Sequence, residues 1–463
     1  MYFSQFIDRE DYLLRLRTAL GRQATQFIVV YGRRRIGKSS LIRQVIDSTR
    51  GDVYFLSDQT TEAHQRAVFA KIVAESIEDF DRVAYPDWET MLRALNRQVS
   101  KRIIVCLDEF PYMVKSCPSL PSVIQKLINE HCLRFDLIIC GSSQQLMQGY
   151  VLDRHEPLYG MADEIIRLVP MRARYICDAL NCDAVNAVEE YAVWGGIPRY
   201  WELRADYDDR ESAIRNLLLD PKGFLSEEPL RLLRDDMRDT VQSATLLSVI
   251  GNGANRISEI AARVERNVTQ LTEPLGRLRD LGYIRREIPF GEDEKKSRKG
   301  LYYINDQLLA FNYRFVVPFR SLLELGGIDR VMTLVSGQFP QFAGYCWEHL
   351  CREFVSGNVI DGIAYNVASR WWGKVFADRD KTDRMVEIDV VAESIDRKHI
   401  LIGECKWTES EDAGRIETRL STLAPLLPFV KRGQTIHLAI FLKNRPTVGS
   451  TAHVFLPDDI MTR

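Results

Sequence analysis

Residues 26 to 43 read QFIVVYGRRRIGKSSLIR, an apolar run followed by a loop bounded by glycines and then by an amphipathic segment. The apolar run predicts a buried strand, and the amphipathic segment predicts a helix. Glycines let backbone N–H groups curl around phosphates, and the helix presents the positive end of its dipole to them. The spacing is GxxxxGKS, so the sequence predicts a phosphate-binding loop between a strand and a helix.

This loop predicts a site for ATP and Mg²⁺. Lys38 is expected to neutralise the β and γ phosphates, and the Ser39 hydroxyl is expected to bind Mg²⁺. A second apolar strand, residues 102–107, ends at Asp108 and Glu109. We expect Asp108 to hold Mg²⁺ through water and Glu109 to orient or deprotonate the attacking water. The nucleotide-binding residues expected in these two segments are Gly32, Gly37, Lys38, Ser39, Ser40 and Asp108.

Residues 386 to 406, VEIDVVAESIDRKHILIGECK, form the second chemical motif. Two apolar, β-branched runs flank a polar turn at 396–398, which predicts an antiparallel hairpin. A turn centred between residues 396 and 397 places Asp389 directly opposite Glu404. Their Cβ atoms would lie roughly 4.5 to 5.5 Å apart on one face, where two carboxylates are unfavourable unless a cation lies between them.

Two carboxylates at this separation suit Mg²⁺, and Lys406 shares the face of Glu404 because it follows by two residues. The Lys406 ammonium could hold an attacking water or offset the charge that develops on phosphorus. The sequence therefore predicts a centre for phosphodiester hydrolysis, with Asp389, Glu404 and Lys406 as catalytic residues and both carboxylates as metal ligands. The alternative is a surface hairpin whose charges are solvated, and the apolar residues around the acids argue against it.

Residues 244 to 316 show a third pattern, three short helical segments followed by two short strands. The third helix is expected over 269–281, and Pro274 fits it only if the helix proper begins near residue 272 or 273. The strands flank GEDEKKSRK, residues 291–299. The pattern resembles a winged helix, whose third helix enters a DNA major groove and whose hairpin tip touches the backbone. The expected DNA-binding residues are Arg277, Lys295, Lys296, Arg298 and Lys299.

Two alternatives for this module stay open. Winged helices in ATPases also serve to pack protein against protein, and a loop rich in Lys and Arg is often only a solvated turn. Glu292, Asp293 and Glu294 stand beside the basic residues and weaken their field.

Residues 6 to about 203 resemble an ATPase family found predominantly in archaea, within the AAA-like P-loop NTPases. Related ATPases place a γ-phosphate sensor where Ser142 stands, which implies that Ser142 binds nucleotide. Such proteins often carry an arginine after PLYG, whereas Met161 and Ala162 follow here, so Arg167 and Arg199 are the alternatives for an arginine finger. The matching segments are FIDRE at 6–10, YGRRRIGKSSL at 31–41, LDEFPY at 107–112, IICGSS at 138–143, PLYG at 157–160 and GGIPRY at 195–200.

The motif near the C-terminus resembles that of the PD-(D/E)XK nuclease superfamily, with Asp389 followed by Glu404-Cys405-Lys406. In that superfamily an upstream helix often adds a carboxylate. The segment 342–355 offers Glu348 as this further metal ligand, and Glu353 on the same helix is the alternative.

The expected fold class is α/β: an AAA-like P-loop NTPase parallel sheet with a helical lid, then a winged helix, then a PD-(D/E)XK nuclease-like α/β domain. A chain of 463 residues is long enough for about three domains. The sequence has no long Gly/Ser linker, which predicts domains that pack together. The expected boundaries are 1–203 for the ATPase domain, 204–240 for the lid or linker, 241–325 for the winged helix and 326–463 for the nuclease-like domain.

The composition of the chain limits which partners and which cellular location we expect. The net charge of −2 gives no overall attraction to nucleic acid, so DNA binding must come from local patches. Nine scattered cysteines without a CxxC pair predict reduced thiols, as in a cytosolic protein. The first residues lack a basic start followed by an apolar run, and no stretch approaches eighteen apolar residues. We therefore expect a cytoplasmic protein that does not span a membrane.

The leading hypothesis is an ATP-controlled, Mg²⁺-dependent enzyme that cuts DNA. ATP is the expected switch and DNA the expected substrate, and a role in defence or mobile-element processing rests on analogy alone. The main alternative is a nucleotide-dependent regulator that binds DNA or a protein without cutting. A third is an assembly ATPase with no nucleic-acid role. The sequence does not decide whether identical copies of the chain assemble.

Overall fold

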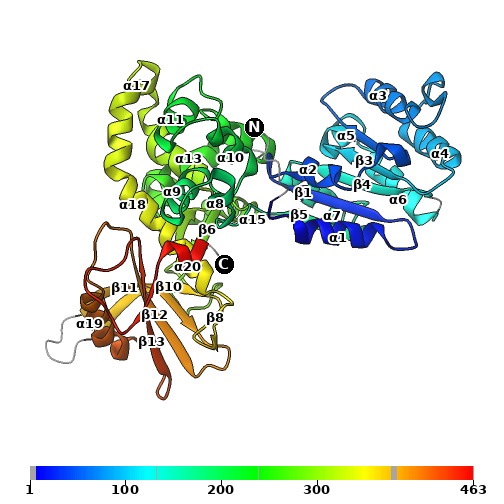
Figure 1. The fold of residues 1–463 in the computed structure, drawn as a ribbon. Helices are drawn as coiled ribbons and strands as arrows, with labels where there is room; N and C mark the ends of the chain where they lie inside the picture. Colours follow the sequence, from blue (N-terminus) through cyan, green and yellow to red (C-terminus); the bar gives the residue numbers. More distant parts are fainter. Residues whose placement is uncertain (1–6, 132, 238, 377–382, 462–463) are drawn as a thin grey trace.

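The computed structural model describes residues 7–131, 133–237, 239–376 and 383–461. Phe6 of the FIDRE segment and Cys132 lie outside these ranges. Figure 1 shows two bodies, a sheet with its own helices and a larger body that holds the remaining helices and a second sheet.

Five parallel strands form the first sheet, in the order β2-β3-β4-β1-β5. β1 (Phe27–Gly32), β3 (Ile104–Asp108) and β4 (Asp136–Gly141) are buried along their whole length, as is typical of apolar strands covered by helices on both faces. The edge strands are β2 (Val53–Leu56) and β5 (Glu164–Leu168). The expected parallel α/β sheet is confirmed. The carboxyl ends of β1, β3 and β4 meet at one edge, which is where open α/β sheets bind ligands.

The helices of this first body are α1 (Glu10–Leu20), α2 (Lys38–Arg43), α3 (Glu62–Ala74), α4 (Trp88–Gln98), α5 (Phe110–Ser116), α6 (Leu120–Asn129) and α7 (Gln144–Leu152). A helical segment follows β5. It contains α8 (Tyr175–Leu180), α9 (Ala184–Trp194), α10 (Pro198–Ala205), α11 (Arg210–Ile214), the π-helical segment η3 (Arg215–Leu219) and α12 (Glu228–Asp236).

Three helices and a hairpin come next: α13 (Thr240–Gly251), α14 (Ile257–Arg263), α15 (Val268–Asp280), β6 (Ile284–Glu287) and β7 (Leu301–Ile304). The expected start of the third helix near residue 272 is wrong, because α15 begins at Val268 and contains Pro274. Asn267 and Gln270 form a reciprocal capping box that fixes this earlier start. Leu271, Leu275 and Leu278 are buried, so packing holds the helix although Pro274 lacks an N–H.

The chain then forms α16 (Gln307–Phe311), the π-helical segment η4 (Asn312–Val316), α17 (Arg320–Glu324) and the long helix α18 (Ile328–Val355). The second sheet has the order β10-β11-β12-β13-β14, with β10, β11 and β12 antiparallel and β12, β13 and β14 parallel. Its elements are β10 (Ser369–Phe376), β11 (Asp383–Glu393), β12 (His399–Lys406), α19 (Ala413–Leu423), β13 (Thr435–Leu442), β14 (His453–Phe455) and α20 (Pro457–Met461), preceded by the short pair β8 (Val359–Ile360) and β9 (Ile363–Ala364).

The hairpin of β11 and β12 has the expected antiparallel register, since Val390 pairs with Gly403. A β-bulge was not expected. Between the pairs Ser369–Val391 and Trp371–Ile388, two residues of β11, Asp389 and Val390, face a single residue of β10. A bulge of this kind re-aims side chains and is frequent beside functional sites.

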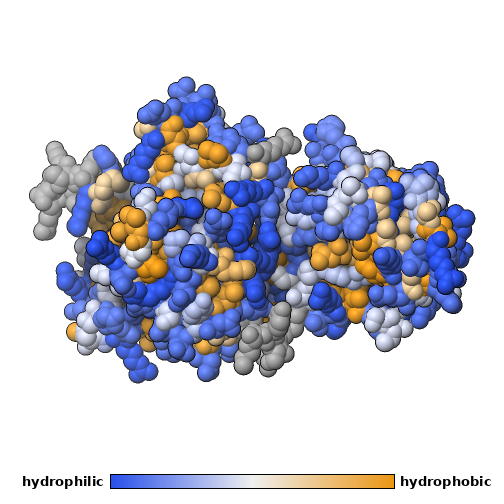
Figure 2. All heavy atoms as spheres, turned by 90° about the horizontal axis from the view of Figure 1, so that it is seen from above, coloured by the Kyte–Doolittle hydropathy of each residue, from blue (hydrophilic) through white to orange (hydrophobic). Residues whose placement is uncertain are grey.

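One hydrophobic core connects the two bodies. It contains Ile28 of β1, Trp194 of α9, Trp347 of α18 and Met461 of α20. Figure 2 shows mainly polar side chains on the visible face, with apolar groups in small clusters. Within the described ranges, no helix combines the length and the apolar character that crossing a bilayer requires.

Candidate functional site

The loop between β1 and α2 is shaped by its glycines. Gly37 has a φ of 95°, a backbone conformation that a side chain disfavours. A Cβ on Gly32 would lie 2.6 Å from the carbonyl oxygen of Leu168, so the close approach of β1 to β5 requires glycine there. Lys38 is buried, and its Nζ donates to the carbonyl oxygens of Gly32 (2.9 Å) and Arg33 (3.0 Å). The ammonium group therefore lies inside the loop that would surround a phosphate.

The expected Mg²⁺ ligands lie side by side. The hydroxyl of Ser39 donates to a carboxylate oxygen of Asp108 at 2.8 Å. Mg²⁺ prefers oxygen ligands, so this pair fits the ion that accompanies ATP. Tyr54 of β2, which the sequence did not single out, also donates its hydroxyl to Asp108. Burial and the Asp108 charge raise the pKa of Tyr54, which keeps that hydroxyl protonated.

Glu109 and Ser142 are brought together at the ends of β3 and β4. The Ser142 hydroxyl and its backbone N–H, at 3.2 Å, both donate to the Glu109 carboxylate. Glu109 itself has a φ of 53°, which is uncommon for a residue with a side chain and is frequent at active sites. The expected water-orienting acid and the expected phosphate sensor are therefore in direct contact.

All three arginines of the loop form ion pairs with acids of the second body. Arg33 pairs with Asp306, which precedes α16, and both side chains are buried. Arg34 pairs with Asp235 at 3.1 Å, and Arg35 pairs with Glu228 at 2.8 Å, both on α12. The three arginines therefore join the loop to parts of the same chain that are distant in sequence.

A second set of contacts also joins the first sheet to the second body. Asp236 at the end of α12 accepts from the backbone N–H of Gln144 (2.9 Å) and from the hydroxyl of Tyr283 (2.7 Å). The Gln144 side chain donates to the carbonyl oxygen of Leu281 at 3.1 Å. Gln144 begins α7, directly after the tip of β4 that carries Ser142. The nucleotide edge of the sheet thus contacts both the helical segment and the three-helix module.

The second motif is also folded as one cluster. Asp389 lies at the bulge in β11, and its carboxylate accepts from the backbone N–H of Cys405 at 2.9 Å. Glu404 is buried and pairs with Lys406 at 2.7 Å and with Arg419 of α19. Burial, and then the charge of Asp389, raise the pKa of Glu404. The two carboxylates therefore interact electrostatically across the hairpin.

Of the two candidate acids on α18, Glu348 and Glu353, Glu348 is the one that faces this cluster. Glu348 and Asp389 both line a cavity of about 620 Å³ between α18, the second sheet and the β6–β7 hairpin. Burial and the charge of Asp389 raise the pKa of Glu348 to about 7. Glu353 instead pairs with His349 at 3.4 Å. Across the described ranges, no three His, Cys, Asp or Glu side chains converge closely enough to hold a metal ion.

The basic loop between β6 and β7 is partly neutralised by its own acids. Lys299 pairs with Glu292 at 2.6 Å. The loop also packs on the second sheet, because Phe290 stacks edge-to-face on Phe429 and its N–H donates to the carbonyl oxygen of Arg370 at 2.9 Å. On α15, Arg277 pairs with Glu273 at 3.4 Å. Lys295, Lys296, Arg298 and Lys299 are exposed.

Glu287 of β6 anchors the hairpin to the C-terminal region. Burial alone would raise the pKa of this carboxyl, but Arg285, Arg352 and Arg370 outweigh it and lower the pKa from 4.5 to about 2. The carboxylate lies 2.8 Å from Arg285, 3.5 Å from Arg352 and 3.4 Å from Arg370.

The Glu287→Gln variant is expected to lose on the order of 2 kcal/mol of unfolding free energy at neutral pH. Because the pKa is lower in the folded protein, the stabilisation is present above pH 4.5 and is lost as the pH falls toward 2. Denaturant unfolding of both proteins between pH 7 and pH 3 measures this difference. Glu409→Gln, at an exposed glutamate, is the matched control. A difference that stays constant with pH would contradict this assignment.

The parallel sheet, the loop around Lys38 and the arrangement of Ser39, Asp108 and Glu109 define a P-loop ATPase. Residues 6–201 match a family described as an ATPase domain predominantly from Archaea. Residues 312–416 match a family described as "Archaea bacterial proteins of unknown function". The chain therefore carries a P-loop ATPase domain similar to the archaeal family, followed by a region similar to the second family.

The chain is similar to several known proteins. An uncharacterized protein of Methanocaldococcus jannaschii is 29% identical over 417 residues, which cover 88% of each chain. The Walker-type ATPase of Pyrococcus abyssi has a TM-score of 0.51 at 19% identity and covers 67% of this chain and 96% of its own. The Aeropyrum pernix ORC2 protein has a TM-score of 0.48 at 14% identity and covers 72% and 96%. The Pyrococcus similarity is one of fold alone.

Proposed function

We propose that this chain is an ATP-controlled enzyme that cuts DNA in the presence of Mg²⁺. ATP would bind at Lys38, Ser39 and Asp108, and phosphodiester hydrolysis would occur at Asp389, Glu404 and Lys406. The observation that carries the proposal is the set of ion pairs from Arg33, Arg34 and Arg35 to Asp306, Asp235 and Glu228. A bound phosphate that attracts the loop would weaken these ion pairs. The bound nucleotide would therefore influence the position of the C-terminal region.

The chemistry of the second cluster supports the cleavage step. Asp389 and Glu404 lie directly beyond the outermost pair of the hairpin, Val390 with Gly403, and Glu348 shares a cavity with Asp389. A bound Mg²⁺ would polarise a phosphoryl oxygen and activate water. Burial, and then the charge of Asp389, raise the pKa of Glu348 and of Glu404, and a bound cation would relieve the repulsion from Asp389. Lys406 would orient the attacking water or stabilise charge on the phosphate.

DNA is the proposed substrate because the exposed cations of the β6–β7 loop and the half-exposed Arg277 of α15 lie on the module that borders the cavity of Glu348 and Asp389. Lys295, Lys296, Arg298 and Lys299 would contact the phosphate backbone, and Arg277 would contact the groove. Such binding is expected to weaken with salt, because it depends on counterion release.

A second function is favoured by a specific observation. Glu404 already pairs with Lys406 and Arg419, and the described acids do not converge as a set of three metal ligands. This arrangement fits a nucleotide-dependent regulator that binds DNA or a protein without cutting. The two functions differ in whether Lys406 is needed for a chemical step.

Asp389→Asn and Lys406→Ala are each expected to abolish DNA cleavage while leaving ATP hydrolysis intact. The assay incubates plasmid and linear DNA with the full chain and Mg²⁺ or Mn²⁺, with and without ATP. Lys431→Ala, at an exposed lysine of the same region, is the matched control and should cleave normally. Binding of DNA without cleavage by the wild type, with ATP altering retention, would replace the nuclease with the regulatory function.

A further inference from the structure

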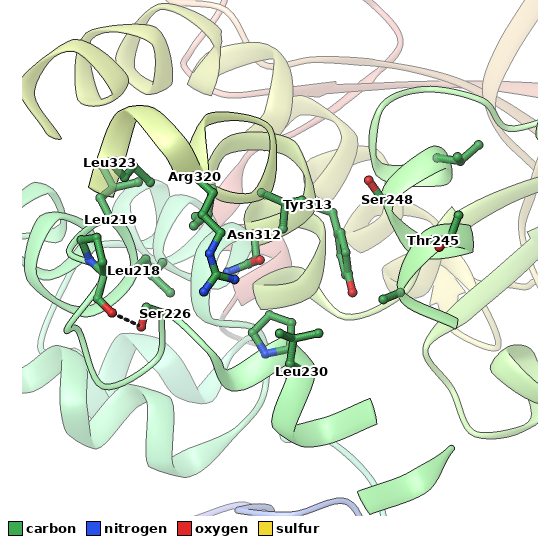
Figure 3. A pocket seen from close by; sticks show the side chains of 16 residues that line it. Leu218, Leu219, Ser226, Leu230, Thr245, Ser248, Asn312, Tyr313, Arg320 and Leu323 are labelled. Atoms are coloured by element: carbon green, nitrogen blue, oxygen red, sulfur yellow. Dashed lines mark hydrogen bonds between the residues drawn. The ribbon is translucent and has the colours of Figure 1, made fainter. Parts of the chain in front are cut away.

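A cavity of about 360 Å³ lies away from both clusters described above. Its walls come from η3 and α12 on one side, α13 on another, and η4 and α17 on a third (Figure 3). Most of its lining is aliphatic, including Leu218, Leu219, Leu230 and Leu323. Two walls are π-helical, and π-helical turns are rare and frequent at functional sites. The volume is within the usual range of small-molecule pockets.

Two polar groups in this lining have no partner. Asn312 and Tyr313 are 2% and 3% exposed, and the Nδ2 of Asn312 and the hydroxyl of Tyr313 make no hydrogen bond within the described ranges. An unpaired buried donor costs about 1–3 kcal/mol, so a native chain rarely keeps two side by side. Burial raises the pKa of Tyr313, so its hydroxyl stays protonated and can donate. Both groups can donate to a single acceptor.

A third donor lies at the mouth. The Arg320 side chain is half-exposed and pairs loosely with Glu324 (3.3 Å) and Glu227 (3.8 Å). In Figure 3, the Arg320 guanidinium and the Tyr313 hydroxyl point the same way, toward Leu230, with the Asn312 amide between them in this view. The cavity therefore combines an apolar floor with donors grouped on one wall.

We propose that this cavity binds a small molecule with an apolar body and an oxygen acceptor, such as a carboxylate, as its head group. The aliphatic walls would hold the body, and Asn312, Tyr313 and Arg320 would donate to the head. A carboxylate satisfies three donors at once, whereas an ammonium group offers no acceptor.

The position of the cavity links it to the ATPase site. Pro229 and Leu230 line it from α12, and the neighbouring Glu228 of the same helix pairs with Arg35 of the phosphate-binding loop. A ligand that shifts α12 would therefore change nucleotide affinity, and nucleotide would change ligand affinity by the same factor.

The test uses the full chain and two probes of equal length, octanoate and octylammonium, observed by saturation-transfer NMR and calorimetry. Octanoate is expected to bind in about the millimolar range, as its small size allows, and octylammonium about tenfold more weakly. Tyr313→Phe should weaken octanoate binding about five- to tenfold. Leu230→Trp, which fills the cavity from its partly exposed side, should abolish it. Tyr345→Phe, at an exposed tyrosine outside the cavity, should leave it unchanged.

Thermal unfolding separates a ligand site from a structural role. The Tyr313 hydroxyl has no protein partner, so Tyr313→Phe should unfold at or above the wild-type temperature. The proposal is overturned if octanoate does not bind, if Leu230→Trp binds it as well as the wild type, or if both probes bind equally. It is also overturned if Tyr313→Phe lowers the unfolding temperature without affecting octanoate, since the hydroxyl would then be held by water alone.

Discussion

Asp306→Ala is expected to lower the free energy of unfolding by about 3–5 kcal/mol, the usual effect of leaving one partner of a buried ion pair without the other. Arg33 is buried, its guanidinium lies over the ring of Tyr283 at 5.2 Å, and its Nε and Nη2 have no hydrogen-bond partner in the described ranges. Asp306 is the acid that pairs with it. Removing that carboxylate leaves the buried guanidinium charge of Arg33 without its acid partner. Chemical denaturation of the wild type and the variant measures the loss.

Two further variants assign the cause. Asp306 also accepts from the backbone N–H of Leu309 at 2.7 Å and so caps α16, a role that Asp306→Asn retains. Compared with Asp306→Ala, Asp306→Asn should therefore regain only the contribution of the helix cap, about 1 kcal/mol of unfolding free energy. Asp235→Ala removes a partly exposed partner of Arg34 and should cost less than about 1 kcal/mol. Equal losses in Asp306→Ala and Asp235→Ala would show that burial does not strengthen the first pair.

Lys38→Ala is expected to reduce ATP hydrolysis by about 100-fold or more, as does the loss of a charged donor that stabilises developing charge in other enzymes. The Lys38 ammonium is held inside the loop by the carbonyl oxygens of Gly32 and Arg33. The ammonium is therefore held within the loop where we expect phosphate charge to develop. Phosphate release, measured under saturating ATP and Mg²⁺, gives the rate.

The control for this variant is Lys71→Ala, at an exposed lysine of α3, which should hydrolyse ATP at the wild-type rate. Circular dichroism should show that Lys38→Ala keeps its helical content. A Lys38→Ala protein that is folded and retains more than about a tenth of the wild-type rate would remove Lys38 from the phosphate site.

Local patterns in the sequence predicted the parts of the fold that depend on neighbours in the chain. The strand before Gly32 and the register of Val390 with Gly403 follow from apolar periodicity and from one turn. Tertiary packing decided what the sequence could not. The start of α15 depends on the burial of leucines around Pro274. The bulge at Asp389 depends on pairing with β10, a strand that the local sequence pattern did not predict.

The candidate sites divide in the same way. Ser39 was predicted from the loop motif, Asp108 and Glu109 from the end of a strand, and Ser142 from the family resemblance. Ser39 contacts Asp108, and Ser142 contacts Glu109. No sequence motif marks Tyr54, because its contact with Asp108 depends on the order of strands in the sheet. The partners of the loop arginines are about two hundred or more residues away in sequence. Long-range ion pairs leave no trace in a single sequence, because any exposed acid satisfies the same local pattern.

The last described helix has a consequence for how the chain matures. α20 packs on α9, which precedes it by more than 260 residues, and Ile460 and Met461 enter the same core as Tyr191. A ribosome adds about 5–20 residues per second, so this face of α9 stays open for roughly 15–50 seconds during synthesis. A separate core lies wholly between Phe27 and Leu158 and can close long before. Chaperones that protect nascent chains are therefore expected to engage the helical segment rather than the face of the first sheet that this separate core covers.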